Sequence, residues 1–219
     1  NLSKTFIEKK NVKVLKKINF KFKLGKIYSL MDPSGSGKST LLNIISLIDR
    51  PTSGSIKFQN NLIDFKNSEK NDLFRANNIG IVHQQDNLLH DFNALENVYL
   101  ACLAAGNEKE KAKNKAISIL KKVGLSSRLE HYPNELSGGE KQRVSISRAL
   151  INEPNIILAD EPTGSLDKKT SDEIFKLLKK QINSKRLIIF ATHNRFLANK
   201  SDCLLEMIDG NIKSTNVRV

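Results

Sequence analysis

Residues 32–40 read Asp32-Pro33-Ser34-Gly35-Ser36-Gly37-Lys38-Ser39-Thr40 and join an apolar run at 27–31 to a helical pattern at 38–48. The two glycines allow the backbone to curl until successive N–H groups point inward, and the start of a helix adds partial positive charge. A strand, a glycine-rich loop and a helix in this order predict a phosphate-binding loop of the Walker A type. In it, Lys38 would neutralise phosphate and Ser39 would hold Mg²⁺. The alternative, a serine-glycine turn before an unrelated helix, fits this context poorly.

Asp32 departs from the Walker A pattern, which begins with glycine. A side chain at this position limits the backbone angles, and a carboxylate should repel phosphate unless it turns away. The N–H groups from Ser34 onward do not depend on this position. Two expectations therefore stay open, a loop that binds phosphate normally and a degenerate loop that binds it weakly.

The composition is that of a globular protein of one domain, with or without a sub-domain. The chain has 219 residues, of which 39% are hydrophobic. These values exclude a disordered tail and a small disulfide scaffold. The apolar runs are shorter than the ~18 residues that a membrane-spanning helix needs, and no export signal is evident. Cys102 and Cys203 lie far apart among apolar residues, which indicates reduced thiols in a cytosolic protein.

Short apolar runs alternate with helical patterns, as in a largely parallel sheet covered by helices. The sequence predicts strands at 27–31, 55–58, 79–83, 156–159 and 187–191, and helices at 38–48, 94–105, 108–123, 138–151 and 168–182, the last capped by Asp167. Residues 204–208 and 212–214 flank Asp209-Gly210-Asn211, which predicts an antiparallel hairpin. Because residues 85–151 contain helices and no convincing strand, we expect a helical sub-domain there, inserted into a core formed by residues 1–84 and 152–219.

Residues 156–161, Ile-Ile-Leu-Ala-Asp-Glu, form an apolar strand pattern that ends in two carboxylates. This is the Walker B arrangement. Neighbouring side chains on a strand point to opposite faces, so the two carboxylates must have different tasks. We expect Asp160 to lie in the Mg²⁺ shell and Glu161 to polarise the attacking water. A strand that merely meets a polar loop is the alternative, and the phosphate-binding loop upstream argues against it.

Residues 136–143 read Leu-Ser-Gly-Gly-Glu-Lys-Gln-Arg and precede a strong helical pattern. Ser137 and Glu140 have capping-box spacing, so the plainest interpretation is a helix start without chemistry. Yet each glycine just inside a helix costs about 1 kcal/mol. That cost suggests that something approaches the backbone closely at Gly138 and Gly139, and a phosphate is the obvious candidate.

With this segment the sequence resembles the ATP-binding-cassette family of ATPases over essentially the whole chain. Residues 136–140, Leu136, Ser137, Gly138, Gly139 and Glu140, match the family signature. The resemblance implies an α/β fold: a P-loop NTPase (RecA-like) core with an inserted helical sub-domain and an antiparallel β element. It also implies the cofactors ATP and Mg²⁺. The partner would be a second copy of the chain, placed head to tail so that the signature of one copy closes on the ATP of the other.

The same resemblance assigns roles to further residues. Gln84 matches a glutamine that contacts Mg²⁺ and the attacking water, and His193 matches a histidine that contacts the γ-phosphate. Asp167, in Ser165-Leu166-Asp167, matches a loop that couples the two sites of the dimer. Phe6 stands where the family places an aromatic residue that stacks on adenine, although Phe6 could be a core residue and Phe20 and Phe22 are rivals nearby. The expected nucleotide-binding residues are Phe6, Ser34, Gly35, Ser36, Gly37, Lys38, Ser39 and Thr40, with Ser39, Gln84 and Asp160 at the metal.

Residues 88–98 and 159–167 are similar to the subfamily of lipoprotein-releasing, macrolide-export and cell-division ATPases. Asp91-Phe92 followed by Ala-Leu-Glu-Asn-Val is most similar to the lipoprotein-releasing ATPases of Gram-negative bacteria. That resemblance implies a peripheral protein on the cytoplasmic face of the inner membrane, bound to two integral-membrane subunits. The segment 84–100 would then dock on those subunits, through Leu88, Leu89, Phe92 and Leu95 unless these belong to the sub-domain core.

The net charge of +13 favours a second class of function, a nucleic-acid-associated cassette ATPase. The basic residues, however, are scattered from Lys4 to Arg218, as a lysine-rich composition alone would place them. Such relatives usually carry paired cassettes, long coiled-coil insertions or zinc modules, and this sequence has none of them. A nucleic-acid partner is therefore not expected.

The carboxylate at position 32 provides a direct test. If it faces the phosphates, Asp32→Gly should tighten ATP binding, because it removes a like charge and restores the usual glycine. Calorimetric titration of the wild-type and variant proteins with ATP would measure the change. An unchanged affinity would show that Asp32 turns away from the nucleotide.

Overall fold

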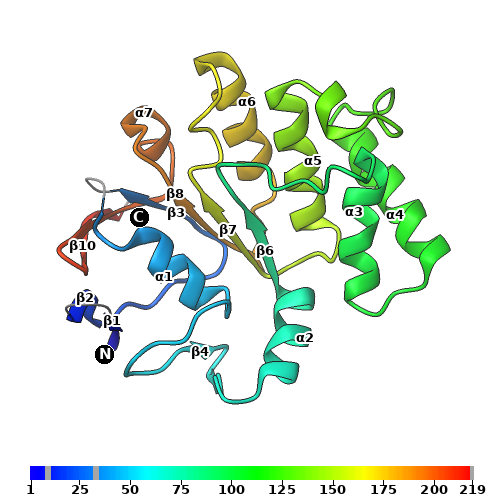
Figure 1. The fold of residues 1–219 in the computed structure, drawn as a ribbon. Coiled ribbons are helices and arrows are strands. Elements are labelled where there is room, and N and C mark those ends of the chain that lie inside the picture. Colours follow the sequence, from blue (N-terminus) through cyan, green and yellow to red (C-terminus); the bar gives the residue numbers. More distant parts are fainter. Residues whose placement is uncertain (8–10, 32–34, 218–219) are drawn as a thin grey trace.

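The computed structural model describes residues 1–7, 11–31 and 35–217, and its centre is a six-stranded sheet (Figure 1). The strand order is β10-β9-β3-β8-β7-β6. All neighbours are parallel except the antiparallel pair at the edge, β9 and β10. The bounds are β3 (Ile27–Met31), β6 (Ile79–Val82), β7 (Ile156–Asp160), β8 (Leu187–Ala191), β9 (Cys203–Ile208) and β10 (Asn211–Val217). The expected α/β class, including its antiparallel element, is confirmed.

The central strands are apolar because helices cover both faces of the sheet. On one face, Leu158 and Ile189 pack with Leu41 of α1 (Lys38–Ile45). On the other face, Ile157 and Phe190 pack with residues of α5 (Gly138–Leu150) and α6 (Lys168–Lys179), and the rings of Phe190 and Phe175 meet edge to face, 5.2 Å between centroids. Each such buried side chain contributes roughly 1.5–3 kcal/mol, which makes this region the rigid support of the strand ends.

Helices α3 (Ala94–Ala104) and α4 (Lys109–Lys122) lie beyond β6, at the opposite end of the sheet from β10 (Figure 1). Their cluster includes Val98, Cys102, Ala112, Leu120 and, from α5, Val144. A short 3₁₀ helix, η1 (Pro133–Glu135), leads into α5. Because α5 packs against both the sheet and the α3–α4 pair, it joins the two parts of the molecule.

Elements outside the central sheet were the ones that sequence patterns missed. They are the hairpin β1 (Leu2–Ile7) and β2 (Asn11–Ile18), the short strand β5 (Asn61–Leu62), and helices α2 (Ser68–Asn78) and α7 (Arg195–Ala198). Two register shifts in β1–β2 break the alternation of apolar side chains. Only Asn71 of α2 is buried, so that helix has no apolar stripe to reveal it.

The predicted elements are present, with shorter ends in several cases. The strand expected at 55–58 is only β4 (Lys57–Phe58). The helix expected at 38–48 ends at Ile45, because Leu47 has a φ of +62°, which no helix continues. The helix expected to reach residue 182 ends at Lys179. Both cysteines are buried and free, as predicted, and no helix in the described ranges is long and apolar enough to cross a membrane.

Gly80 of β6 allows a close packing between strand and helix that can be tested. A Cβ at this position would lie 2.3 Å from the backbone oxygen of Ala149 in α5. Because a backbone carbonyl cannot rotate away, Gly80→Ala should lower the free energy of unfolding by about 3 kcal/mol. Urea denaturation would measure the loss.

The matched control is Gly106→Ala. A Cβ on Gly106 would meet nothing within 4 Å, so this variant should cost only the strain of its φ of +86°, about 1 kcal/mol. Equal losses in the two variants would contradict the steric interpretation of Gly80.

Candidate nucleotide-binding and hydrolytic site

The loop before α1 has the backbone that a phosphate-binding loop needs. Gly35 and Gly37 have φ angles of +93° and +99°, in the left-handed region that favours glycine. Gly37 is also packed tightly, since a Cβ there would lie 2.8 Å from Cγ1 of Val14 and 3.0 Å from Cδ2 of Leu15. As the N-cap of α1, Gly37 offers no side-chain cap to the first N–H groups of the helix. Asp32 and Ser34 lie outside the described residues.

The side chains of this loop suit an anionic ligand. Lys38 is only 7% exposed, and burial lowers its pKa, while the charges of Glu161 and Asp160 act in the opposite direction. Among the described residues, the buried hydroxyl of Ser36 finds no hydrogen-bond partner. Ser39 is exposed and Thr40 is half-buried. A phosphate at this loop would place an anion beside the Lys38 ammonium and would supply an acceptor for a buried hydroxyl.

The two carboxylates follow β7, and the chain turns sharply between them. Asp160 ends the strand beside Ala191 of β8, whereas Glu161 has a φ of +47°, uncommon for a residue with a side chain. Two backbone hydrogen bonds hold this conformation: Glu161 N donates to Ala191 O at 3.0 Å, and Glu161 O accepts from Gly164 N at 3.0 Å. The chain therefore leaves the strand conformation between Asp160 and Glu161.

Glu161 meets His193 across the ends of β7 and β8. His193 Nε2 lies 2.5 Å from Glu161 Oε1, and the carboxylate is 21% exposed. Thr192, which precedes His193, is buried, and its N–H donates to Leu30 O at 3.1 Å. The two residues are far apart in the sequence, and the parallel pairing of β7 with β8 brings them together.

Gln84 lies just beyond β6 and packs on the loop that follows Glu161. A Cβ on Gly164 would lie 2.8 Å from Gln84 Nε2, so this glycine leaves room for the glutamine side chain. The preceding residue, His83, is held by Gln142, whose Nε2 donates to His83 O at 3.1 Å. Burial lowers the pKa of His83, so its imidazole is neutral at pH 7.

The segment 136–140 forms a capped start of α5. Ser137 N donates to Glu140 Oε2 at 2.8 Å, and Glu140 N donates to Ser137 Oγ at 3.3 Å. Arg128 Nε lies 2.9 Å from Glu140 Oε1. The Ser137 N–H, followed by Arg128, lowers the pKa of Glu140 to about 2. Leu136 is buried, while Ser137 and Gly138 are exposed to solvent.

The glycines of this segment are packed against their own chain. A Cβ on Gly139 would lie 2.8 Å from Cγ2 of Thr170, and one on Gly138 would lie 3.3 Å from Cδ2 of Leu166. The sequence pattern indicated a close approach here, with phosphate as the candidate. Within the chain, the groups that approach are a threonine methyl of α6 and a leucine of the loop before it.

Asp167 caps α6, as predicted from the sequence. Its Oδ1 accepts from Lys169 N at 2.9 Å and from Thr170 N at 3.0 Å, and Thr170 Oγ1 donates to its Oδ2. The hydrogen bond from the Thr170 hydroxyl, above all, lowers the pKa of Asp167. Thr170 therefore donates a hydrogen bond to Asp167 through its hydroxyl, and its methyl group lies beside Gly139.

Comparison with known proteins shows the family of the chain. Residues 15–164 match the family described as ABC transporter. The chain belongs to that family. It is 43% identical to the lipoprotein-releasing system ATP-binding protein LolD of Ehrlichia ruminantium (strain Gardel), over 97% of this chain and 94% of that protein. It is 42% identical to LolD of Wigglesworthia glossinidia brevipalpis, over 99% and 96%.

Solved structures give the same result. The dimeric ATP-binding cassette MJ0796 bound to ADP and Pi is 37% identical, with a TM-score of 0.91 over 100% of this chain and 97% of that chain. A second dimeric structure of MJ0796, 38% identical, also has a TM-score of 0.91. As a family member, the chain is an ABC-type ATPase that binds nucleotide, and the expected enzyme class is confirmed.

Phe6 lies on β1 of this ABC ATPase and is 38% exposed. The two other candidate aromatic residues, Phe20 and Phe22, pack against each other edge to face, with 4.8 Å between ring centroids. Phe22 also meets Tyr28 at 5.1 Å. Phe6 is therefore the most exposed of the three rings, since Phe20 and Phe22 are half-buried. Its role in nucleotide binding stays a prediction.

The four apolar residues of segment 84–100 that were expected to dock divide evenly between core and surface. Leu88 and Leu95 are 4% and 8% exposed and belong to the α3–α4 cluster, whereas Leu89 and Phe92 are 49% and 37% exposed. Asn97 fixes the loop, because its side chain bonds to Leu89 N, Leu89 O and Phe92 O. Of these four residues, Leu89 and Phe92 are the exposed ones.

Sequence reasoning missed several residues that shape the site. Gly164 accommodates Gln84, Thr170 supports Asp167, and Arg128 pairs with Glu140. The spacing of Thr170, three residues after the cap Asp167, was a usable signal for a capping interaction. No local pattern pairs Arg128 with Glu140, because the intervening chain turns through η1.

The low pKa of Glu140 predicts a pH-dependent contribution to stability. Its pKa is about 2 in the folded protein, below the ordinary value, so the stabilisation is present above pH ~5 and is lost as the pH falls toward 2. Glu140→Gln should lower the free energy of unfolding by about 1–2 kcal/mol at pH 7 after allowance for solvent screening, and by less at pH 3. Urea midpoints at both pH values would measure this difference.

Glu135→Gln is the matched control. Glu135 Oε2 accepts a similar bond, from Tyr132 N at 2.7 Å, and no ion pair with a cation is seen for it in the described structure. Its substitution should show a smaller dependence on pH. A pH-independent loss in Glu140→Gln would contradict the assignment.

Proposed function

We propose that the chain is the ATP-hydrolysing subunit of a multi-subunit ABC transporter that releases lipoproteins from the inner membrane. The observation that supports it most is the meeting of Glu161 and His193, 2.5 Å apart, beside the phosphate-binding loop of a chain that resembles LolD proteins over nearly its whole length. The relatives' printed names supply the cargo class.

In this proposal the phosphate-binding loop holds ATP. The N–H groups of residues 34–40 and the Lys38 ammonium bind the phosphates, and Phe6 contacts the adenine. Ser39, Asp160 and Gln84 hold Mg²⁺, which would neutralise charge on the phosphate oxygens. These oxygen donors suit Mg²⁺, which takes few protein ligands and completes its shell with phosphate and water.

Glu161 is the proposed general base, which accepts the proton of the attacking water. Glu161 has a φ of +47°, and one of its carboxylate oxygens lies against His193 Nε2. The second carboxylate oxygen remains to orient water. The imidazole that contacts Glu161 would also contact the γ-phosphate of bound ATP, so His193 would link the nucleotide to the general base.

The start of α5 is the second part of the chain that would contact ATP. Ser137 and Gly138 are exposed, and their helix start faces outward with partial positive charge. We propose that it closes on ATP bound to a second copy of the chain, with Asp167 at the same interface. The dimeric structures of MJ0796 support a homodimer. Gly138 lies beside Leu166, and Gly139 lies beside Thr170. A movement at the start of α5 would therefore be transmitted to the Asp167 loop.

Membrane subunits are proposed as further partners. Leu89 and Phe92, exposed on the segment fixed by Asn97, would dock on two integral-membrane proteins at the cytoplasmic face of a bacterial inner membrane. Residues 85–151 would act as the helical sub-domain that carries this surface and the signature.

Glu161→Gln tests the hydrolytic proposal. The amide keeps the shape but cannot accept a proton, so turnover should fall at least about 100-fold while an ATP-bound dimer persists. Phosphate release and size-exclusion chromatography with ATP would measure both effects. Glu173→Gln, which changes a surface carboxylate 3.5 Å from Arg143, is the control and should keep wild-type turnover. Turnover near the wild-type rate in Glu161→Gln would overturn the base assignment.

The cargo is tested by reconstitution. The chain should co-purify with two integral-membrane proteins from detergent-solubilised membranes, and the complex should release lipoproteins from proteoliposomes only with ATP. ATP hydrolysis that proceeds without lipoprotein release would keep the ATPase assignment and reject the cargo.

A further inference from the structure

Strand β1, which carries Phe6, is held in place by the segment that follows the P-loop helix α1. Several hydrogen bonds join them: Ser3 N donates to Ser53 O at 2.9 Å, Thr52 N donates to Ser3 O at 2.9 Å, and Thr5 N donates to Thr52 Oγ1 at 3.0 Å. The position of Phe6 relative to the phosphate-binding loop is therefore set through residues 49–53.

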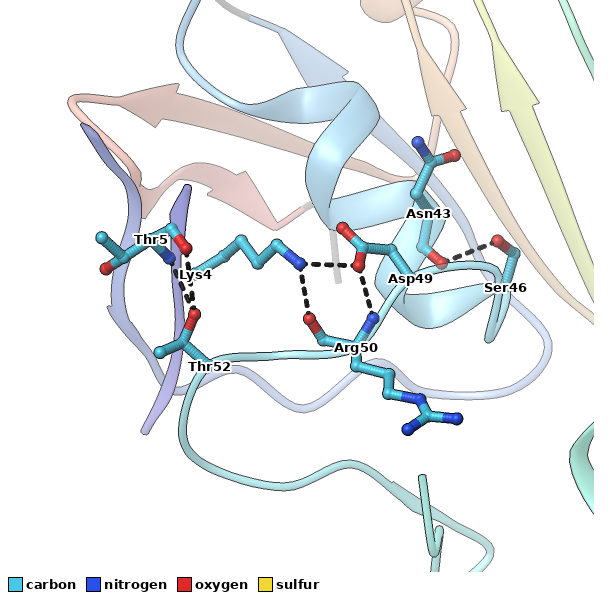
Figure 2. Close-up of polar contacts among 7 residues, drawn as sticks. All are labelled: Lys4, Thr5, Asn43, Ser46, Asp49, Arg50 and Thr52. Atoms are coloured by element: carbon cyan, nitrogen blue, oxygen red, sulfur yellow. Dashed lines mark hydrogen bonds and ion pairs between the residues drawn. The ribbon is translucent and has the colours of Figure 1, made fainter. Parts of the chain in front are cut away.

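Lys4 adds a side-chain connection at the same place (Figure 2). Its Nζ lies 2.6 Å from Asp49 Oδ1 and donates to Arg50 O at 2.8 Å. The same Asp49 oxygen accepts from Arg50 N at 2.6 Å, so the carboxylate is oriented by its own backbone. The Lys4 side chain is only 12% exposed, which makes this pair better defined than an ordinary surface ion pair.

The ammonium of Lys4 also contacts Phe6. Nζ lies 4.8 Å from the centroid of the ring, within the range of a cation–π interaction. One cation thus joins a ring on β1 to the segment that follows the P-loop helix. The ring keeps 38% of its surface exposed.

Phe6 lies on the face of the hairpin that is turned toward the phosphate-binding loop. It pairs with Val12 of β2, and paired residues share a face of the sheet. Lys4, two residues before Phe6 on β1, shares that face because side chains alternate along a strand, and its partner Leu15 shares it too. Leu15 Cδ2 is one of the atoms that a Cβ on Gly37 would meet, at 3.0 Å. The exposed ring therefore lies on the face of the hairpin that packs against the phosphate-binding loop.

We propose that Lys4 is a positioning residue for the nucleotide base: clamped by Asp49 and Arg50, it holds the Phe6 ring where adenine stacks. The inference rests on the proposed ATP site and adds a residue to it. Lys4 acts through Phe6 and makes no contact with the phosphates, so it should affect ligands that carry a base and no others.

The test compares ATP with inorganic tripolyphosphate, which has the phosphates but no base. Calorimetry without divalent metal would measure both affinities for the full chain and its variants. Phe6→Ala should weaken ATP binding about 10- to 100-fold, as expected for one stacked base. Lys4→Met, which keeps the aliphatic stem, should weaken it about fivefold, within the usual range of a cation–π contact. Tripolyphosphate binding should stay within twofold of wild type in both.

Four further variants complete the design. Lys4→Arg should restore ATP binding, because guanidinium can keep both the ion pair and the ring contact. Asp49→Asn should weaken ATP as Lys4→Met does, and it tests the clamp if Lys4→Met folds poorly. Lys13→Met removes an exposed lysine from the opposite face of the hairpin and should change neither affinity. In a Phe6→Ala background, Lys4→Met should have no additional effect.

Several results would overturn the inference. They are an unchanged ATP affinity in Lys4→Met, an equal loss for both ligands, or a loss that persists without Phe6. An unchanged ATP affinity in Phe6→Ala would reject stacking on this ring, and the inference with it, while the ATPase proposal stands. Wild-type protein that binds neither ligand would instead reject the proposed site itself.

Discussion

The parallel pairing of β7 with β8 is the constraint on which the site depends. It sets Asp160 beside Ala191, and the bond from Glu161 N to Ala191 O then holds the turn at Glu161. His193 reaches Glu161 because both follow the carboxyl ends of adjacent strands, where ligands bind in open α/β sheets. A different register would move Glu161 and His193 apart, whatever their local sequence.

Close packing at glycines connects this sheet edge to the rest of the molecule. Gly80 brings α5 onto β6, and Gly139 brings the start of α5 onto α6 beside Thr170. Because interiors are densely packed, a shift of α5 must be passed to its neighbours. Three regions are therefore connected through α5: residues 136–140 at its start, the helical cluster along its side, and the Asp167 loop.

Patterns that lie within a short stretch of sequence were predicted well. The P-loop, the strand that ends in Asp160 and the cap at Asp167 depend on local spacing, and the buried central strands are continuous apolar runs. The hairpin β1–β2 and helix α2 were missed, because the hairpin is interrupted by register shifts and α2 buries only Asn71. Helix ends were predicted too long where a backbone angle, as at Leu47, stops the helix.

Local sequence was enough to predict the fold class, the family and the residues proposed to bind phosphate, since those predictions depend on neighbours along the chain. The tertiary structure alone decided that Glu161 meets His193, that Arg128 holds Glu140, that Leu89 and Phe92 are exposed while Leu88 and Leu95 are buried, and that Lys4 joins Phe6 to Asp49. These contacts depend on strand register and helix packing between distant segments, which no local pattern encodes.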